Sequence, residues 1–385
     1  MDRRFFLKAM GVLGCSAAAH PWLTTLTLAA TPGENRLVVI ILRGAMDGLD
    51  VVQPRGDAGL LSARPGVLGP GLDLDGFFSL HEGLGGLMPL WQAGELAFVH
   101  ATSTPYRDKR SHFDGQDLLE AGTGTDLLPA EQRDGWLNRL LQAMPGAGSE
   151  TAWDVGRDAT LLLAGASQVQ NWAPDQDMAL SAPARALLEH VYAGDPLFHE
   201  ASATAFNLAG MDAGKAAGGA QDVDLIAGFV AERLRGPARI AAFSLTGWDT
   251  HKGQINTIRR PLAQLQAAIL RLREGVGPEI WGKTVVLAMT EFGRTVQQNG
   301  SGGTDHGTGG AMLVAGGAAR GGQVLGRWPG LSEAALYDRR DLMPTSDVRD
   351  WAAQALQGLF GLDRALLEGT VFPGLKMETA PGLIL

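Results

Sequence analysis

Short apolar runs alternate along the chain with stretches in which apolar residues recur at helical spacing. The runs are rich in β-branched and aliphatic residues, as expected of strands that are buried on both faces. They cover residues 36–48, 95–101, 159–165, 238–247, 283–291 and 310–317. The helical periodicity covers residues 84–94, 134–144, 183–194, 222–236 and 257–275. This alternation predicts an α/β fold with a largely parallel sheet.

The first thirty residues carry a different pattern. Two consecutive arginines precede Phe6, Leu7 and Lys8, and a short apolar run follows, which is typical of a twin-arginine export signal. We therefore expect a signal peptide over residues 1–30 and a single domain over residues 31–385. The protein would be periplasmic or otherwise exported, with the twin-arginine translocase as its partner during export. An ordinary amphipathic first helix is the alternative.

Cys15, the only cysteine, lies within this signal. Cleavage near Ala30 would leave no intramolecular disulfide, so stability would come from the core, for which 45% hydrophobic residues are available. Alternatively, the residues VLGC form a lipoprotein signal, and an acylated Cys15 anchors the protein. No later apolar run is long enough to cross a membrane, so we expect no integral membrane segment in the mature chain.

Charge and missing motifs exclude several classes of function. The formal net charge is −9, and nucleic acid and anionic lipid both require a basic surface, so neither is an expected partner. No Walker A loop and no GxGxxG, GxSxG, HExxH or CxxC motif occurs. Their absence removes the commonest nucleotide-binding, serine-hydrolase and zinc-peptidase assignments.

Polar residues stand at the ends of the predicted strands, where parallel α/β sheets bind ligands. Asp47 comes at the end of the run 36–48, and Asp249 and His251 follow the run 238–247. In extended backbone, a spacing of two sends both side chains to the same side, so that one metal ion or phosphate meets Asp249 and His251 together. The structural alternatives are a turn residue at Asp47 and a helix cap at Asp249.

The next two strand ends add four more candidates. Glu291 ends the run 283–291, and Arg294 follows three residues later. A carboxylate there can ligate a hard cation and an arginine can hold an anion, although an isolated pair would form a plain salt bridge. Six glycines between residues 300 and 310 flank Asp305 and His306. Glycine lets backbone approach a ligand and imidazole is a common metal ligand, but a surface loop is the alternative.

Ser111 opens a helical pattern, directly after Arg107, Lys109 and Arg110. A hydroxyl at a helix N-terminus amid positive charge is well placed to attack a phosphoryl or sulfuryl centre, because the helix dipole and the cations offset its developing negative charge. The same residues also match a capping box, since Asp114 follows Ser111 by three positions. By itself the pattern favours the cap.

Several of these segments together resemble a known family. The twin-arginine start and the stretches LRGAMDGLDVV, PLWQAGELAFVHA, RSHFDGQDLLE, GWDTHKGQ, TEFGRTVQQNGSGGTDHGTGGAMLVAGG and DLMPTSDVRD look like family 1501 of the domains of unknown function. The likeness runs from about residue 36 to 360. That family is similar in fold to the alkaline phosphatase superfamily, which includes sulfatases and cofactor-independent phosphoglycerate mutases. The resemblance implies a three-layer α/β sandwich with a mainly parallel central sheet and a two-metal site at the strand ends.

By order along the chain, the resemblance implies Ser111 as the nucleophile. It implies metal ligands at Asp47, Asp249, His251 and His306. Two features depart from the active superfamily. Glu291-Phe292 stands where an Asp-His pair is usual, and a single residue separates Asp249 from His251, where the usual separation is longer.

Two hypotheses of function follow. The first is an exported hydrolase of phosphate or sulfate esters, acting on a small molecule or a carbohydrate. Ser111 and Arg294 would be its catalytic residues, and divalent metal (zinc, magnesium or calcium) would be bound by ligands from the set Asp47, Asp249, His251, Glu291, Asp305 and His306. The alternative is a non-catalytic periplasmic protein that binds a glycan or a protein partner on the same scaffold. Its nine tryptophans would suit sugar stacking.

Overall fold

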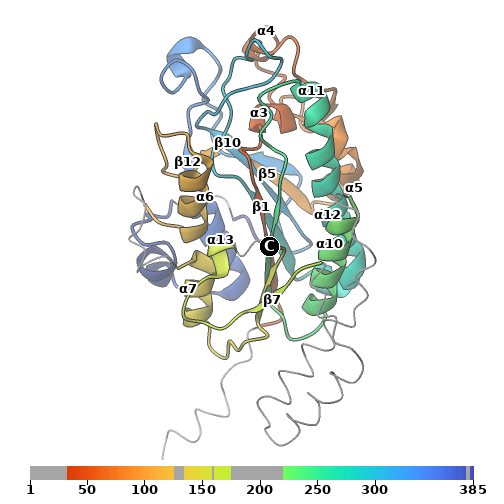
Figure 1. Ribbon diagram of the computed structural model, residues 1–385, viewed down its shortest axis with the longest axis vertical. Helices are drawn as coiled ribbons and strands as arrows, with labels where there is room; N and C mark the ends of the chain where they lie inside the picture. The colour runs from red at the N-terminus through yellow and green to blue at the C-terminus, as the bar shows by residue number, and fades with distance from the viewer. Residues whose placement is uncertain (1–32, 125–133, 158–159, 175–219, 379–381) are drawn as a thin grey trace, which may run out of the picture.

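The fold centres on one nine-stranded sheet, which Figure 1 shows edge-on. The computed structural model describes residues 33–124, 134–157, 160–174, 220–378 and 382–385. Along the sheet the strand order is β11-β5-β10-β9-β1-β8-β6-β7, and β12 also pairs with β5. The strands are β1 (Arg36–Leu42), β5 (Leu96–Ser103), β6 (Ala152–Val155), β7 (Gln170–Trp172), β8 (Ile240–Leu245), β9 (Thr284–Met289), β10 (Gly310–Ala315), β11 (Gln323–Leu325) and β12 (Ser346–Asp347).

The sheet is mainly parallel. β1 pairs in parallel with β8 and β9, β6 with β7 and β8, and β5 with β11 and β12. β10 is the exception, because it runs antiparallel to both β5 and β9. The carboxyl ends of β1, β5, β8 and β9 therefore meet at one edge of the sheet, and β10 begins at that same edge.

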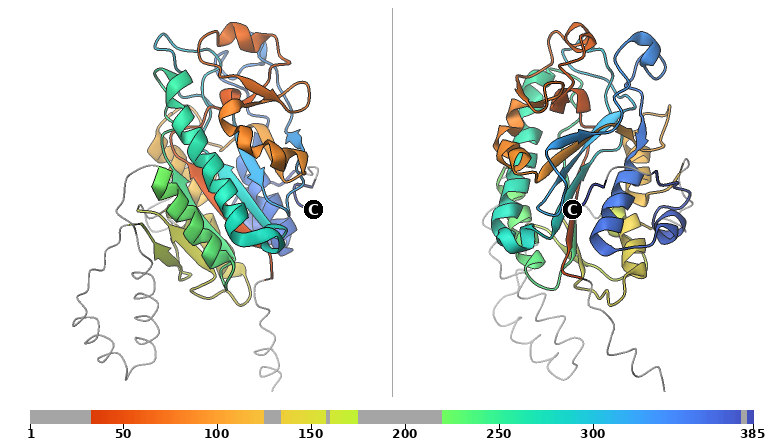
Figure 2. Two further views of the ribbon diagram at one scale, coloured as in Figure 1. Left: turned by 90° about the vertical axis from the view of Figure 1, so that its right-hand side faces the viewer. Right: turned by 180° about the vertical axis from the view of Figure 1, so that it is seen from behind.

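Helices cover both faces of the sheet, so the molecule has three layers (Figure 2). Val38, Ile40 and Leu42 of β1 point into one core cluster, together with residues of α10 and α12. The alternate residues Leu37 and Val39 join the second cluster, with residues of α7 and α13. Because every residue of β1 is buried, its apolar pattern is continuous rather than alternating. The predicted fold class, a three-layer α/β sandwich with a mainly parallel sheet, is confirmed.

The two helical layers have the following members. On one face lie η2 (Glu82–Leu87), α5 (Met88–Gln92), α10 (Ala220–Leu234) and α12 (Arg259–Trp281), and on the other lie α6 (His112–Ala121), α7 (Trp136–Ala143), η4 (Leu161–Leu163), α13 (Val348–Phe360) and η6 (Leu367–Val371). The short elements α3 (Gly48–Val51), α4 (Gly59–Ala63), α11 (Gln254–Thr257), η5 (Glu333–Ala335) and α14 (Arg364–Leu366) complete the described helices. A small antiparallel sheet has the order β2-β4-β3, with β2 (Val52–Gln53), β3 (Gly71–Asp73) and β4 (Ser79–His81).

One predicted strand is wrong. Residues 161–163 within the run 159–165 form the 3-10 helix η4, and the sheet instead continues through β6 at Ala152–Val155. The apolar run of leucines fits either structure, because periodicity alone does not separate a short buried strand from a buried helical turn. The predicted signal over residues 1–30, with Cys15, and the predicted helix 183–194 lie outside the described residues. None of the helices in the described part of the chain is long and apolar enough to span a membrane.

Gly44 allows the segments that follow β1 and β8 to lie against each other. It has a φ of +113°, and a Cβ atom at this position would lie 2.6 Å from the backbone nitrogen of Asp249. Gly247 has a similar φ of +100°, but the nearest atom to a Cβ there would be 3.9 Å away. The first glycine is needed for both its conformation and its close approach, and the second for its conformation alone.

We expect Gly44→Ala to destabilise the protein more than Gly247→Ala. Gly247→Ala, the control, should lower the unfolding free energy by about 1–2 kcal/mol, because alanine is penalised there only for the left-handed conformation. Gly44→Ala adds a further loss of about 1–3 kcal/mol from overpacking against Asp249. Urea denaturation followed by circular dichroism measures both values, and equal losses would contradict the role of close approach.

Candidate functional site

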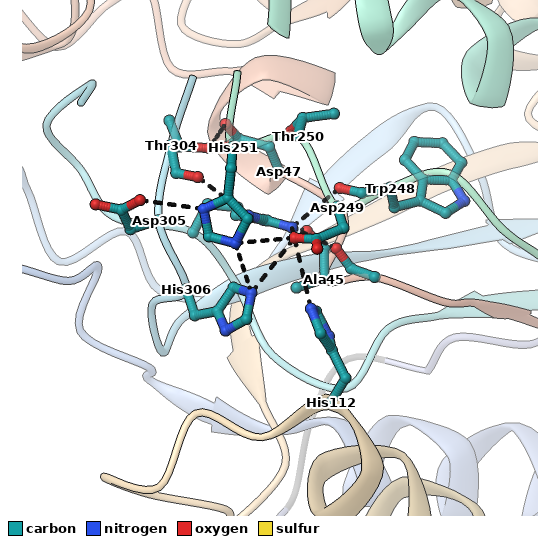
Figure 3. A network of polar contacts seen from close by, with 12 residues as sticks. Ala45, Asp47, His112, Trp248, Asp249, Thr250, His251, Thr304, Asp305 and His306 are labelled. Atoms are coloured by element: carbon teal, nitrogen blue, oxygen red, sulfur yellow. Dashed lines mark hydrogen bonds and ion pairs between the residues drawn. The ribbon is translucent and has the colours of Figure 1, made fainter. Parts of the chain in front are cut away.

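Side chains from three segments converge at the carboxyl edge of the sheet. His112 is the first residue of α6, which follows β5, while Asp249 and His251 follow β8. Asp305 and His306 lie in the glycine-rich segment that leads into β10. Figure 3 shows the three imidazoles turned toward the carboxylate of Asp249. His112, Asp249, His251 and His306 form a cluster. Three of its four members, Asp249, His251 and His306, are candidates from the sequence.

Each histidine of the cluster has an acceptor facing its Nδ1 atom. His112 Nδ1 lies 2.7 Å from Glu291 Oε1, and His251 Nδ1 lies 3.1 Å from Asp305 Oδ1. His306 Nδ1 lies 2.9 Å from the backbone oxygen of Arg110. Because carboxylate and carbonyl oxygens only accept, each Nδ1 carries the proton and donates it. In the neutral imidazoles, the Nε2 atoms are then left with lone pairs.

These three Nε2 atoms surround one carboxylate oxygen. Asp249 Oδ1 lies 3.1 Å from His251 Nε2, 3.3 Å from His306 Nε2 and 3.5 Å from His112 Nε2. His251 Nε2 and His306 Nε2 are 2.9 Å apart. His112 Nε2 is buried and has no hydrogen-bond partner among the described residues. When the three rings are neutral, lone pairs and a negative oxygen face one another, and a cation among them would remove the repulsion.

The donor set fits a divalent metal ion. Ligand atoms of His112, Asp249 and His306 all lie within 4.8 Å of one another, and His251 Nε2 is in contact with two of these residues. Imidazole nitrogens with one carboxylate are the ligands that Zn²⁺ prefers, whereas Mg²⁺ and Ca²⁺ prefer oxygen. Each imidazole also has the Nδ1 partner that usually orients a metal-binding histidine.

Arg294 holds the negative charge of Asp249. Its Nη2 lies 2.6 Å from Asp249 Oδ1. Burial of Asp249 opposes ionisation, but the hydrogen bond and charge of Arg294 outweigh it and lower the pKa of Asp249 to about 2. Arg294 is 1% exposed and also donates to the backbone oxygens of Gly44, Ala45, Trp248 and Thr304. A direct contact of Arg294 with a substrate anion would require some of these bonds to break, so the arrangement favours a positioning role.

Two predicted ligands lie behind the cluster. Glu291 is fully buried, and its oxygens accept from Gly44 N, Thr290 Oγ1 and Gln116 Nε2 as well as from His112. Burial opposes the ionisation of Glu291, but these hydrogen bonds lower its pKa. A metal ion would have to displace a protein donor to reach it. Asp305 is half exposed, and the hydrogen bond from Asn299, with that from His251, lowers its pKa.

Asp47 belongs to a separate buried network. Its Oδ2 accepts from Arg64, Gln254 and Thr304, and its Oδ1 accepts from the backbone nitrogen of Leu49. Asp47 is therefore the N-cap of α3, which agrees with the structural alternative for this residue. Asp47 is not among the residues whose ligand atoms group with those of His112, Asp249 and His306.

Ser111 is the N-cap of α6. Its Oγ accepts from the backbone nitrogen of Asp114 at 3.4 Å, and its own backbone nitrogen donates to the hydroxyl of Tyr106. The capping interpretation of the sequence is therefore confirmed. A cap does not exclude a second role, because Ser111 directly precedes His112 of the cluster and is only partly buried.

His112 is the residue that sequence reasoning missed. It lies within the stretch RSHFDGQDLLE that the family resemblance already includes. The capping pattern identifies Ser111 as the start of the helix but gives no indication that the next residue, His112, faces the site. The signal that could have found it was a histidine in the first turn of a helix that follows a buried strand.

The glycine-rich segment is packed against neighbouring backbone and is not a loop projecting from the surface. Gly307 N donates to Gly293 O at 2.8 Å, and Gly293 N donates to Thr308 O at 3.0 Å. Arg294 and His306 form an isolated antiparallel β-bridge. A Cβ atom at Gly293 would overlap the backbone of Gly309, so glycine is required for this approach. The packing sets His306 beside the residues that follow β9.

The fold and the cluster define an α/β protein with a group of His and Asp side chains whose ligand atoms could hold a metal ion. The chain belongs to the family described as "Protein of unknown function (DUF1501)", which matches residues 101–371. No curated protein matches the chain.

Solved structures similar to the chain have low sequence identity. A protein in the alkaline phosphatase superfamily from Vibrio parahaemolyticus is 14% identical, with 85% of this chain and 67% of that chain covered and a TM-score of 0.40. The lipoteichoic acid synthase LtaP from Listeria monocytogenes is 8% identical, with 89% and 76% covered and a TM-score of 0.43. Ps i-CgsB, in complex with k-i-k-neocarrahexaose, is 10% identical, with 88% and 74% covered and a TM-score of 0.41.

We expect Asp249→Asn to change the acid stability of the metal-free protein. The folded-state pKa of Asp249, about 2, lies below the ordinary value of 3.8, so its contribution to stability is present above about pH 4 and is lost as the pH falls toward 2. The unfolding free energy of the wild type should therefore fall more steeply over this range than that of Asp249→Asn. Chemical denaturation at a series of pH values measures both, and parallel curves would contradict the ion pair with Arg294.

Proposed function

We propose that this protein is a metal-dependent hydrolase of phosphate or sulfate esters. The observation that carries the proposal is the convergence of His112, His251 and His306 Nε2 atoms on Asp249 Oδ1. Three oriented imidazoles and a carboxylate would hold the ion. When bound, such an ion supplies a Lewis acid that polarises the ester and offsets the negative charge that develops on it.

Charged residues beside the cluster support an anionic substrate. Arg110, whose carbonyl oxygen contacts His306, has a side chain that is 41% exposed. Lys109 and Lys252 are exposed, and they adjoin Arg110 and His251 in the chain. Arg110 Nη2 lies 3.9 Å from Asp341 Oδ2, so Lys109 and Lys252 are the candidates for attracting an anionic ester to a protein whose net charge is −9.

Ser111 is the proposed nucleophile. Its hydroxyl would attack the phosphorus or sulfur of the ester and form a bond to it as the bond to the alcohol breaks. The proton of the serine leaves, in net terms, with the alcohol. Water then cleaves the serine ester, releases phosphate or sulfate, and restores the hydroxyl. The position of Ser111 at the N-terminus of α6 offsets negative charge on its oxygen.

Export through the twin-arginine pathway completes the proposal. It rests on the arginine pair and on Phe6, Leu7 and Lys8, and it would place the enzyme in the periplasm. A carbohydrate ester is one substrate class that such a compartment would present to it.

We expect ester hydrolysis to be lost when a side chain that binds the metal is removed. Purified wild-type protein should contain a divalent metal by elemental analysis and should hydrolyse an aryl phosphate or an aryl sulfate. Asp249→Ala and His306→Ala should each lose the metal and reduce kcat/KM by about 100-fold or more. Asp224→Ala, at an exposed acid on α10, is the matched control and should keep both. A metal bound without hydrolysis of either ester class would favour the alternative, a non-catalytic binding protein.

Substitution of Ser111 separates its two roles. Ser111→Asn keeps a capping oxygen but removes the hydroxyl, whereas Ser111→Ala removes both. If Ser111 is the nucleophile, both variants should lose kcat by about 1000-fold or more while only Ser111→Ala loses about 1 kcal/mol of stability. Activity assays and thermal unfolding measure the two effects, and an active Ser111→Asn would leave Ser111 as a cap alone.

A further inference from the structure

Glu291 and Phe292 are adjacent residues that both contact His112. Glu291 Oε1 lies 2.7 Å from His112 Nδ1. The ring of Phe292 stacks on the ring of His112, with centroids 5.3 Å apart and planes at 20°. One residue therefore meets the edge of the imidazole and the next meets its face. Together they restrict both the position and the orientation of the ring.

We propose that Glu291 and Phe292 are positioning residues that make His112 a metal ligand, without being ligands themselves. Glu291 fixes the proton of His112 on Nδ1, and Phe292 fixes the plane of the ring, so that the lone pair of Nε2 points at the metal position. This inference rests on the proposed metal centre and extends it to residues that do not touch the ion.

The surroundings of Glu291 Oε1, the atom that faces His112, require it to accept hydrogen bonds. Gly44 N and Gln116 Nε2 donate to it at 3.0 and 3.1 Å, and Thr290 Oγ1 lies 2.9 Å from the other oxygen, Oε2. Thr290 Oγ1 is also within hydrogen-bond distance of Leu42 O. A carboxylate that is fully buried and surrounded by donors is held ionised and in place. His112 Nδ1 must therefore donate to it, which leaves Nε2 without a proton in the neutral ring.

Phe292 links two of the proposed ligands. Its ring lies between Tyr106, at 6.0 Å and 18°, and His112, and it also lies 5.2 Å from the ring of His306. Phe292 is only 2% exposed, so the ring that packs on His112 is itself fixed by the surrounding protein. Close packing of aromatic faces contributes about 0.5–1.5 kcal/mol beyond burial, enough to select one ring orientation.

Gly115 lets α6 approach this pair closely. A Cβ atom at Gly115 would lie 3.0 Å from the ring of Phe292 and 3.3 Å from Cβ of Glu291. Glycine in a helix interior costs about 1 kcal/mol relative to alanine, and here it provides the space that Phe292 occupies. The helix that carries His112 is thus packed directly on the two residues that orient it.

The other two imidazoles have weaker support. His251 Nδ1 faces Asp305, whose side chain is 51% exposed, and His306 Nδ1 faces a backbone carbonyl. Glu291 is fully buried whereas Asp305 is half exposed, so solvent screens the hydrogen bond to Glu291 less than that to Asp305. Substitution of Glu291 should therefore affect metal binding more than the same change at Asp305, which makes Asp305→Asn a matched control.

The first test measures Zn²⁺ affinity by competition with a chromophoric chelator. Glu291→Gln keeps an oxygen acceptor but removes the charge, and should weaken binding by about 10-fold, whereas Glu291→Met removes the acceptor and should weaken it by about 100-fold. Phe292→Leu should weaken binding as well, and Asp305→Asn should have a smaller effect than Glu291→Gln. In a His112→Ala background, Glu291→Gln should cause no further loss, because its effect acts through His112.

The second test does not depend on how the variants fold. Long-range ¹H–¹⁵N NMR of the metal-free wild type, recorded at a pH high enough for His112 to be neutral, reports which nitrogen of the ring carries the proton, and we expect Nδ1. A neutral ring with its proton on Nε2, or a Glu291→Gln effect of equal size with and without His112, would overturn the inference. A wild-type protein that binds no Zn²⁺ would instead overturn the proposed metal centre, and the two failures are therefore distinguishable.

Discussion

The buried guanidinium of Arg294 joins three segments of backbone that lie beyond the ends of the strands. Its donors reach the carbonyls of Gly44 and Ala45 after β1, of Trp248 after β8, and of Thr304 in the glycine-rich segment. A buried cation is costly unless its donors are filled, and removal of such a cation would leave several carbonyls without partners. A side chain thus ties together the segments that follow the strands, and it contacts Asp249 at 2.6 Å.

The histidine cluster adds a second constraint, which is directional. Each imidazole has its Nδ1 atom tied to an acceptor outside the cluster, so the orientation of the Nε2 atoms is determined by residues that do not take part in the convergence. Glu291 and Phe292 illustrate the point, because they contact His112 at Nδ1 and at the face of its ring, and leave Nε2 free to face Asp249. His112 thus brings a third imidazole to the cluster from an element other than the glycine-rich segment.

Much of the fold could be predicted from the chain alone, because a strand buried on both faces is uniformly apolar, as in β1 and β9. The strand predicted at leucines 161–163 is wrong, because a buried helical turn and a buried strand share the same apolar pattern. For the site, the polar residues directly after strands were found, since position along the chain places them at the edge. What local pattern could not give was the partner of each side chain. Glu291 faces His112 across 179 positions, and Asp47 has its carboxylate filled by Arg64, Gln254 and Thr304.

The antiparallel direction of β10 has a consequence for how this site can vary. In a parallel sheet, the connection between neighbouring strands crosses to the opposite edge, usually through a helix. Here β9 and β10 are joined by residues 290–309, which stay at one edge throughout and include Glu291, Phe292, Arg294, Asp305 and His306. Changes in this one segment could alter the imidazole of His306, the supports of His112 and His251, and the guanidinium of Arg294 together. The sheet beneath would keep its pairing, because residues 290–309 lie outside its strands.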